Sequence, residues 1–253
     1  MSIYYSRYKS GECEAVFKEL VNPSIDLTQP SLRAAAEDVA KELVDRSFTN
    51  ILTLFNRLKE LGYLFENSEE VVLEATELDL VALDNLELSC GVLPIVARKW
   101  YERISSVNFT QQSKQLFSKD GSPCSAVSGL GLNAPLVFLS VPRCLVLQEQ
   151  LYNDAVTDGE DPRRWKHFLP LGGWGSNSNP KGFWLPCHSF DAEFYNDGAG
   201  PVSFVEELRT AFRWGGFPFW RRLLAGRSQA QPVRCIPSFE AILPALTEGI
   251  LPI

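Results

Sequence analysis

Histidine and paired cysteines are scarce in this sequence. It contains only two histidines, His167 and His188, and none of its six cysteines belongs to a CxxC pair. Because HxxxH and CxxC spacings are both missing, the usual ligand sets of a zinc ion are missing too. The glycine clusters at residues 129–131 and 172–175 match neither the dinucleotide-binding order nor the P-loop order. We therefore expect neither a metal nor another cofactor.

Long apolar runs are also missing. No stretch approaches the roughly 18–20 apolar residues that a membrane-spanning helix needs. Residues 1–10 lack the apolar region of an export signal. The cysteines lie far apart in a chain of 253 residues, which is typical of reduced thiols. These absences predict a cytoplasmic protein that does not enter a membrane.

Basic residues are the minority among the charged ones. The chain has 24 Lys and Arg against 31 Asp and Glu, and its formal net charge is −7. Affinity for nucleic acid depends on neutralising phosphates with Lys and Arg, so this balance disfavours a nucleic-acid partner. An acidic chain is better suited to a basic protein partner.

The clearest helix signal lies at residues 203–217. Ser203 can cap a helix, and Glu206, three positions later, can complete a capping box. The apolar residues that follow at helical spacing are Phe204, Leu208 and Phe212. Two glycines at 215–216 end the pattern, since glycine accepts the left-handed turn of many helix ends. Aromatic residues crowd this end, so we expect the helix to fold onto a sheet.

The first half of the chain carries further helical patterns. Apolar stripes predict helices at residues 30–43, 49–61, 76–90 and 95–104. The first two are joined by a very short connection, which predicts either an antiparallel pair or one bent, continuous rod. Thr76 and Asp79 repeat the capping pattern, and we expect Leu80, Leu83 and Leu86 to face one way.

Strand signals are concentrated in the second half. Short apolar or alternating runs predict strands at residues 106–110, 136–141, 168–171, 183–185 and 190–195. Shorter helical patterns occur at residues 143–152 and 239–246. The runs at 168–171 and 183–185 are expected to pair across the polar loop 172–182. Residues 1–25 show no clear period.

The separation of helices from strands predicts an α+β fold. We expect a helical N-terminal half packed on a mixed or antiparallel sheet, with C-terminal helices covering the sheet. Residues 1–253 are interpreted as a single domain. Its parts are an N-terminal helical flank (1–65), a core (76–217) and a C-terminal helical extension (225–253). The flank is either a separate subdomain or a part of the same core.

The core region follows a recognisable order. An acidic, leucine-containing helix precedes a Leu-Pro dipeptide and then a helix that bears aromatic residues. The residues at these places are Leu83, Leu86, Leu93, Pro94, Trp100 and Tyr101. A strand-like run follows at 134–137, and residues 204–217 have the character of a C-terminal helix. In this order, residues 76–217 resemble the SUKH superfamily.

The resemblance implies a mixed α+β domain without catalysis. Bacterial members of the superfamily often act as immunity proteins that bind and neutralise toxins, frequently nucleases. Some eukaryotic relatives act as interaction modules in signalling. The resemblance therefore predicts a protein partner such as a cognate toxin.

Charge is distributed unevenly along the chain. Between residues 60 and 90 there are nine acidic residues and no Lys or Arg. These acidic residues are Glu60, Glu66, Glu69, Glu70, Glu74, Glu77, Asp79, Asp84 and Glu87. The arginines of the last part of the chain are Arg209, Arg213, Arg221, Arg222, Arg227 and Arg234. Either the two regions neutralise each other in the fold, or the acidic residues face a basic partner.

In the second case, residues 66–87, which we call the acidic segment, would contact the partner. Its candidate contact residues are Glu66, Glu69, Glu70 and Glu74, with Trp174 or Trp220 as an aromatic anchor. Trp174 belongs to the loop 172–182, together with Asn177 and Lys181. This loop is either a recognition loop or a hairpin loop whose tryptophan covers the sheet, and we expect the second.

An enzymatic alternative rests on Cys187, His188 and Asp191, which hold a nucleophile, a base and an orienting carboxylate close together. Neighbours on a strand point to opposite faces, so Cys187 and His188 are poorly placed to share a proton. Members of a catalytic triad usually converge from distant segments. We therefore expect no enzyme. A cysteine-dependent hydrolase or transferase, and a regulatory scaffold without a toxin partner, remain as alternatives.

Overall fold

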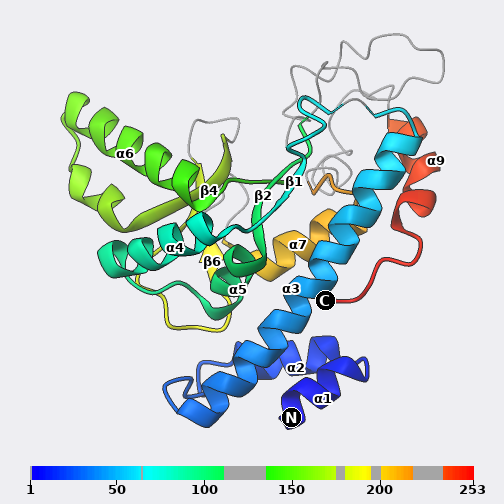
Figure 1. The fold of residues 1–253 in the computed structure, drawn as a ribbon, viewed down its shortest axis with the longest axis horizontal. Coiled ribbons are helices and arrows are strands. Elements are labelled where there is room, and N and C mark those ends of the chain that lie inside the picture. The colour runs from blue at the N-terminus through cyan, green and yellow to red at the C-terminus, as the bar shows by residue number, and fades with distance from the viewer. Residues whose placement is uncertain (1, 64, 111–134, 175–179, 195–200, 219–235) are drawn as a thin grey trace, which may run out of the picture.

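The computed structural model describes residues 2–63, 65–110, 135–174, 180–194, 201–218 and 236–253 (Figure 1). Its first elements are α1 (Ile3–Lys9), α2 (Cys13–Leu20), α3 (Pro30–Glu60), β1 (Val72–Glu74), α4 (Glu77–Cys90), α5 (Ile95–Arg103), β2 (Ile104–Asn108) and β3 (Val137–Phe138). They are followed by α6 (Val141–Thr157), the 3-10 helix η2 (Pro162–His167), β4 (Phe168–Trp174), β5 (Pro180–Trp184), β6 (Glu193–Phe194), β7 (Val202–Ser203), α7 (Phe204–Arg213) and α9 (Ile236–Thr247). Helices combine with short antiparallel strands, which confirms the α+β class.

A single helix of 31 residues, α3, replaces the two helices predicted at 30–43 and 49–61. The Ser47 hydroxyl donates to the Leu43 carbonyl oxygen at 2.9 Å, so it bonds within the helix and does not cap a new one. Pro30 lies in the first turn, where its missing N–H costs no hydrogen bond. The continuous alternative is therefore the correct one. Figure 1 shows α3 crossing the molecule, with α1 and α2 near one end and α9 along the other.

The first residues form two short helices that no pattern predicted. In α1, the Ser2 hydroxyl accepts a hydrogen bond from the Tyr5 amide at 3.1 Å and caps the helix. In α2, the buried side chains are Cys13, Val16, Phe17 and Leu20. They share one helix face, but α2 is only eight residues long, so its period is short. The Phe17 ring packs edge-on against Phe190 with 6.1 Å between centroids, which ties α2 to the second half of the chain.

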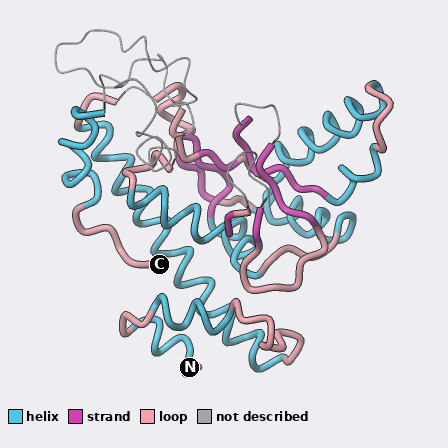
Figure 2. The backbone as a smooth tube through the Cα atoms, turned by 180° about the vertical axis from the view of Figure 1, so that it is seen from behind, coloured by secondary structure: helices cyan, strands magenta, loops and turns pink. Residues whose placement is uncertain are grey.

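The strands form small antiparallel sheets of order β1-β2-β3, β4-β5 and β6-β7. Phe168 pairs with Trp184, which confirms the predicted pairing of the two runs across the polar loop. The Leu139 amide donates to the Leu171 carbonyl oxygen at 2.7 Å and links the first sheet to the second. Figure 2 shows the strands gathered in the middle of the molecule with helices on both sides.

Several strand boundaries differ from the prediction. Strand β1 lies in the acidic segment and is too short to show an alternating pattern. The strand predicted at 136–141 is limited to β3, because Val141 already begins α6 with a proline in the first turn. Strand β2 starts at Ile104, directly after α5, and not at residue 106.

Helix α7 begins as the capping pattern predicted. The Ser203 hydroxyl accepts a hydrogen bond from the Glu206 amide at 3.2 Å. The helix ends at Arg213, and Gly215 and Gly216 follow with φ of 60° and 93°. A Cβ on Gly216 would lie 2.8 Å from the Phe109 ring, so this position requires glycine for space as well as for its φ.

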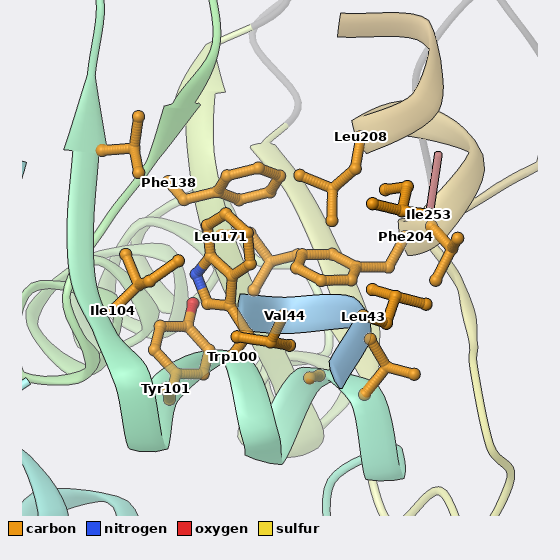
Figure 3. Close-up of a cluster of buried hydrophobic side chains, with 14 of the residues drawn as sticks. Leu43, Val44, Trp100, Tyr101, Ile104, Phe138, Leu171, Phe204, Leu208 and Ile253 are labelled. Atoms are coloured by element: carbon orange, nitrogen blue, oxygen red, sulfur yellow. The ribbon is translucent and has the colours of Figure 1, made fainter. Parts of the chain in front are cut away.

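The centre of the core joins α3, α5, β3 and α7 (Figure 3). The Phe204 ring lies 5.3 Å from Trp100, 5.1 Å from Phe138 and 5.7 Å from Phe183, measured between centroids. Figure 3 also shows Leu43 and Val44 of α3 beside this aromatic group. Helix α7 therefore packs against the strands, as its aromatic sequence predicted. Helix α9 packs along α3.

Candidate interaction surface

The start of α4 is held rigidly in place. Its N-terminus carries the predicted capping box: the Thr76 amide donates to Asp79 Oδ2 at 2.9 Å, and the Asp79 amide donates to Thr76 Oγ1 at 3.3 Å. The Ser105 hydroxyl donates to Asp79 Oδ1 at 3.0 Å, which joins α4 to β2. Burial alone raises the pKa of the Asp79 carboxyl, but the hydrogen bonds from Thr76 and Ser105 outweigh it and lower the pKa. Asp79 is thus a structural member of the acidic segment.

Part of the acidic segment is neutralised inside the fold. Among the described residues, the arginines that pair with it belong to α5 and not to the last part of the chain. Arg98 lies 3.0 Å from Asp84 and also pairs with Glu87. Arg103, at the end of α5, pairs with Glu74. Two arginines of α5 therefore compensate three of the predicted acidic residues, Glu74 among them.

The arginines near the C-terminal end do not reach the acidic segment within the described residues. Arg209 pairs with Glu206 at 2.7 Å and with Glu14 at 2.9 Å. Arg213 is exposed and has no ion pair within those residues. The other four arginines, Arg221, Arg222, Arg227 and Arg234, lie outside the described residues.

Four carboxylates of the acidic segment stay exposed and form no ion pair with any described residue. They are Glu66, Glu69, Glu70 and Glu77. The backbone around the first three is ordered by hydrogen bonds: the Glu66 amide donates to the Thr110 carbonyl oxygen at 2.8 Å, and the Glu70 amide donates to the Asn67 carbonyl oxygen at 3.3 Å. Three of the four predicted contact residues are therefore available to a partner, whereas Glu74 is engaged by α5.

The side chains of the two predicted aromatic anchors lie outside what the structure describes. Trp174 ends β4 opposite Pro180 of β5, and its side chain lies outside what the structure describes. Trp220 and Asn177 lie outside the described residues altogether. Lys181 is described, and its ammonium group pairs with Glu207 at 2.6 Å. This lysine joins β5 to α7 and is therefore part of the fold.

A second feature of α4 escaped the sequence pattern. Leu83 and Leu86 are buried as predicted, but Leu80 is exposed. Three further apolar residues, which we call the outer stripe, are exposed to 82%, 57% and 86%; they are Leu78, Val81 and Leu88. The signal was present, because α4 has more apolar residues than one face of a helix can bury.

The described residues do not form the catalytic arrangement that the enzymatic alternative requires. The Cys187 thiol lies 3.0 Å from the Ser189 hydroxyl, and His188 is exposed. The ring of the other histidine, His167, lies 3.2 Å from the Cys90 carbonyl oxygen. No hydrogen bond within the described part of the chain joins a histidine to a cysteine thiol or to a carboxylate.

Asp191 caps α7 instead. One carboxylate oxygen accepts from the Ala192 amide at 2.9 Å and the other accepts from the Val205 amide at 3.3 Å. Burial raises the pKa of Asp191 to about 6, and hydrogen bonds from Ser203, Val205 and Ala192 act in the opposite direction. The three residues of the proposed catalytic group are thus placed in separate roles.

Two further features of the described ranges concern metals and membranes. Within those ranges, no group of three or more His, Cys, Asp or Glu side chains is arranged to hold a metal ion. None of the helices described there combines the length and apolar character that crossing a membrane requires.

Comparison with protein-family models, with curated proteins and with solved structures finds no match for this chain.

Proposed function

We propose that this chain is a non-catalytic interaction protein of the SUKH type, which acts in the cytoplasm as an immunity protein. Its partner would be a basic, nuclease-like toxin that it binds and neutralises. The sequence resemblance over residues 76–217 supports the class of protein, and the net charge of −7 supports a basic protein and not a nucleic acid as the partner.

One observation carries the proposal. Asp84, Glu87 and Glu74 are paired with arginines of α5, but Glu66, Glu69 and Glu70 remain exposed, close together in the chain and without a described ion pair. Exposed like charges at this density raise the local negative potential, which speeds the encounter with a positive surface. Their mutual repulsion is relieved when a basic surface binds.

The test starts from the neighbouring genes, because an immunity gene normally lies beside the gene of its toxin. The toxin domain encoded there is titrated with wild-type protein and with the variant E66K/E69K/E70K. We expect about a 100-fold loss of affinity for the variant and weaker binding of the wild type as salt increases.

A matched control changes the same amount of charge elsewhere. D38K/E149K/D154K replaces three exposed carboxylates of α3 and α6, and it should bind the toxin within a few-fold of wild type. If both variants bind equally well, the acidic segment is not the contact surface. If the neighbouring gene encodes no basic toxin, the scaffold alternative is favoured.

A further inference from the structure

Two residues of the outer stripe lie opposite to the buried side of α4, and the third lies at the edge of that exposed side. At about 100° per residue, Val81 and Leu88 are on the far side of the helix from Leu83 and Leu86. Leu78, one turn before Val81, lies at the edge of this far side, about 60° around the helix from Val81. The result is three exposed apolar side chains along a helix of 14 residues, with the polar residues Asp84 and Asn85 between Val81 and Leu88. Single exposed apolar residues are ordinary, but three on one helix, each more than half exposed, make this side a candidate interaction surface.

Helix α4 is also rigid, which favours its use as a recognition element. Besides the capping box and the Ser105 contact, Arg98 of α5 bonds Glu87 and Asp84, and Leu93 donates its amide to Glu87 Oε1 at 2.9 Å. Figure 1 shows α4 on the left of the molecule beside α6 and apart from α3. A helix that is already ordered loses little conformational entropy when it binds, so its apolar area converts efficiently into affinity.

Charge on α4 indicates what covers the stripe. The helix carries four carboxylates and no Lys or Arg. Glu77 and Asp84 lie along one edge of the stripe at helical spacing, and both are exposed. Asp84 already pairs with Arg98, whereas Glu77 forms no ion pair with a described residue. A second copy of the chain would place these carboxylates against each other. A partner with Lys or Arg beside an apolar surface would instead pair with them.

We propose that α4 docks its outer stripe, Leu78, Val81 and Leu88, onto an apolar surface rimmed by Lys or Arg on the basic partner. This inference rests on the proposed function. It assigns the apolar anchor of the interface to α4, because the side chains of the two predicted tryptophan anchors lie outside what the structure describes. The carboxylates guide the encounter, and the buried stripe then slows dissociation. The mode is that of a helix seated in an apolar groove, with anchors at i, i+3 and i+10.

The probe is a pair of synthetic Leu/Lys peptides of about 18 residues, long enough to form a helix when bound. One places all leucines on a single helix face, and the other has the same composition with the leucines spread around the helix. Fluorescence anisotropy measures their binding to wild-type protein, to L78Q/V81Q/L88Q and to the control V146Q/Y152Q/V156Q. The control removes exposed apolar residues of α6, and glutamine is well tolerated in helices.

The proposal expects the one-faced peptide to bind wild-type protein at least about 10-fold more tightly than its isomer. The α4 variant should lose this preference, and the α6 control should keep it. Equal binding of the two peptides to wild-type protein, or an unchanged preference in the α4 variant, overturns the proposal. Circular dichroism and the melting temperature of each variant show whether the fold is intact.

Two further measurements separate this inference from the proposed function. If E66K/E69K/E70K loses the toxin but L78Q/V81Q/L88Q binds it normally, the docking role of α4 fails and the proposed function stands. If neither variant affects toxin binding, the proposed function fails as well. Sedimentation that shows a wild-type dimer, converted to monomer by L78Q/V81Q/L88Q, would assign the stripe to a second copy and overturn the proposal.

Discussion

Helices α4 and α7 begin in the same way but present different surfaces. Each has a hydroxyl cap at its first turn, Thr76 for α4 and Ser203 for α7. In α7, even the polar residues Glu207 and Thr210 are buried, and Glu207 and Arg209 each form an ion pair with a residue of another element. In α4, only one side is buried, and the opposite side is apolar and exposed. The comparison separates a helix that holds the fold together from one that can receive a partner.

The largest effect is expected at the centre of the α7 packing. Phe204→Ala removes a ring in contact with Trp100, Phe138 and Phe183, and the cavity should cost about 3–5 kcal/mol of unfolding free energy. Urea denaturation followed by tryptophan fluorescence measures the change. A loss below about 1 kcal/mol would mean that α7 does not organise the core.

A smaller effect is expected from the ion pair that joins β5 to α7. Lys181→Ala leaves the Glu207 carboxylate buried without its cation and should cost about 2–3 kcal/mol, since Lys181 itself is partly exposed. On α4, Asp84→Asn should cost under about 1 kcal/mol, because that carboxylate is exposed. Equal costs at the two sites would remove the contrast between the helices. The double variant Lys181→Met with Glu207→Leu, which leaves no buried charge, should recover most of the lost stability.

The buried cap of α7 should make stability depend on pH. The folded-state pKa of Asp191 is about 6, above its ordinary value of 3.8, so the folded protein binds this proton more tightly than the unfolded chain. Stability from this group is therefore greatest below the ordinary pKa and is lost as pH rises through about 6. Between pH 5 and pH 7 the loss should be about 1 kcal/mol.

The variant Asp191→Asn is the control for this group, because it keeps an acceptor oxygen and cannot ionise. Its unfolding free energy should lack the Asp191 contribution to the pH dependence. If wild type and variant change in parallel between pH 5 and pH 7, Asp191 does not titrate as described.

The smallest effect is expected on the outer stripe. Leu88→Ala should change the unfolding free energy by less than about 0.5 kcal/mol, because this side chain is exposed and contributes little to packing. Leu86→Ala, two positions earlier but buried, is the positive control and should cost about 2–5 kcal/mol. A large cost at Leu88 would show that the stripe is needed for the fold and would weaken its assignment to a partner.

Much of the local structure could be predicted from neighbouring residues. The caps at Thr76 and Ser203, the glycines that end α4 and α7, and the hairpin of β4 and β5 depend on short-range geometry. Whether the chain breaks near Ser47 could not be decided locally, because a hydroxyl that can cap a new helix can also bond back to the carbonyl four residues earlier. Helices α1 and α2 were missed because two turns carry too short a period.

For the candidate surface, the concentration of acidic residues could be predicted, but their ion pairs could not. The acidic segment was recognisable from composition, and three of its four proposed contact residues are exposed and free of described ion pairs. That Arg98 and Arg103 of α5 neutralise Asp84, Glu87 and Glu74 depends on how two helices pack, and no local pattern encodes it.

Local sequence is enough to predict where α4 and α7 begin and end, the α+β class and the concentration of negative charge, because each depends on residues that are near one another in the chain. Which leucines of α4 are buried and which carboxylates are paired depends on the tertiary structure. Burial and ion pairing are contacts between distant segments, and a helix with two apolar faces can turn either of them inward. The packing of α4 against α5 and α6 selects Leu83 and Leu86 for the core and leaves Leu78, Val81 and Leu88 in solvent.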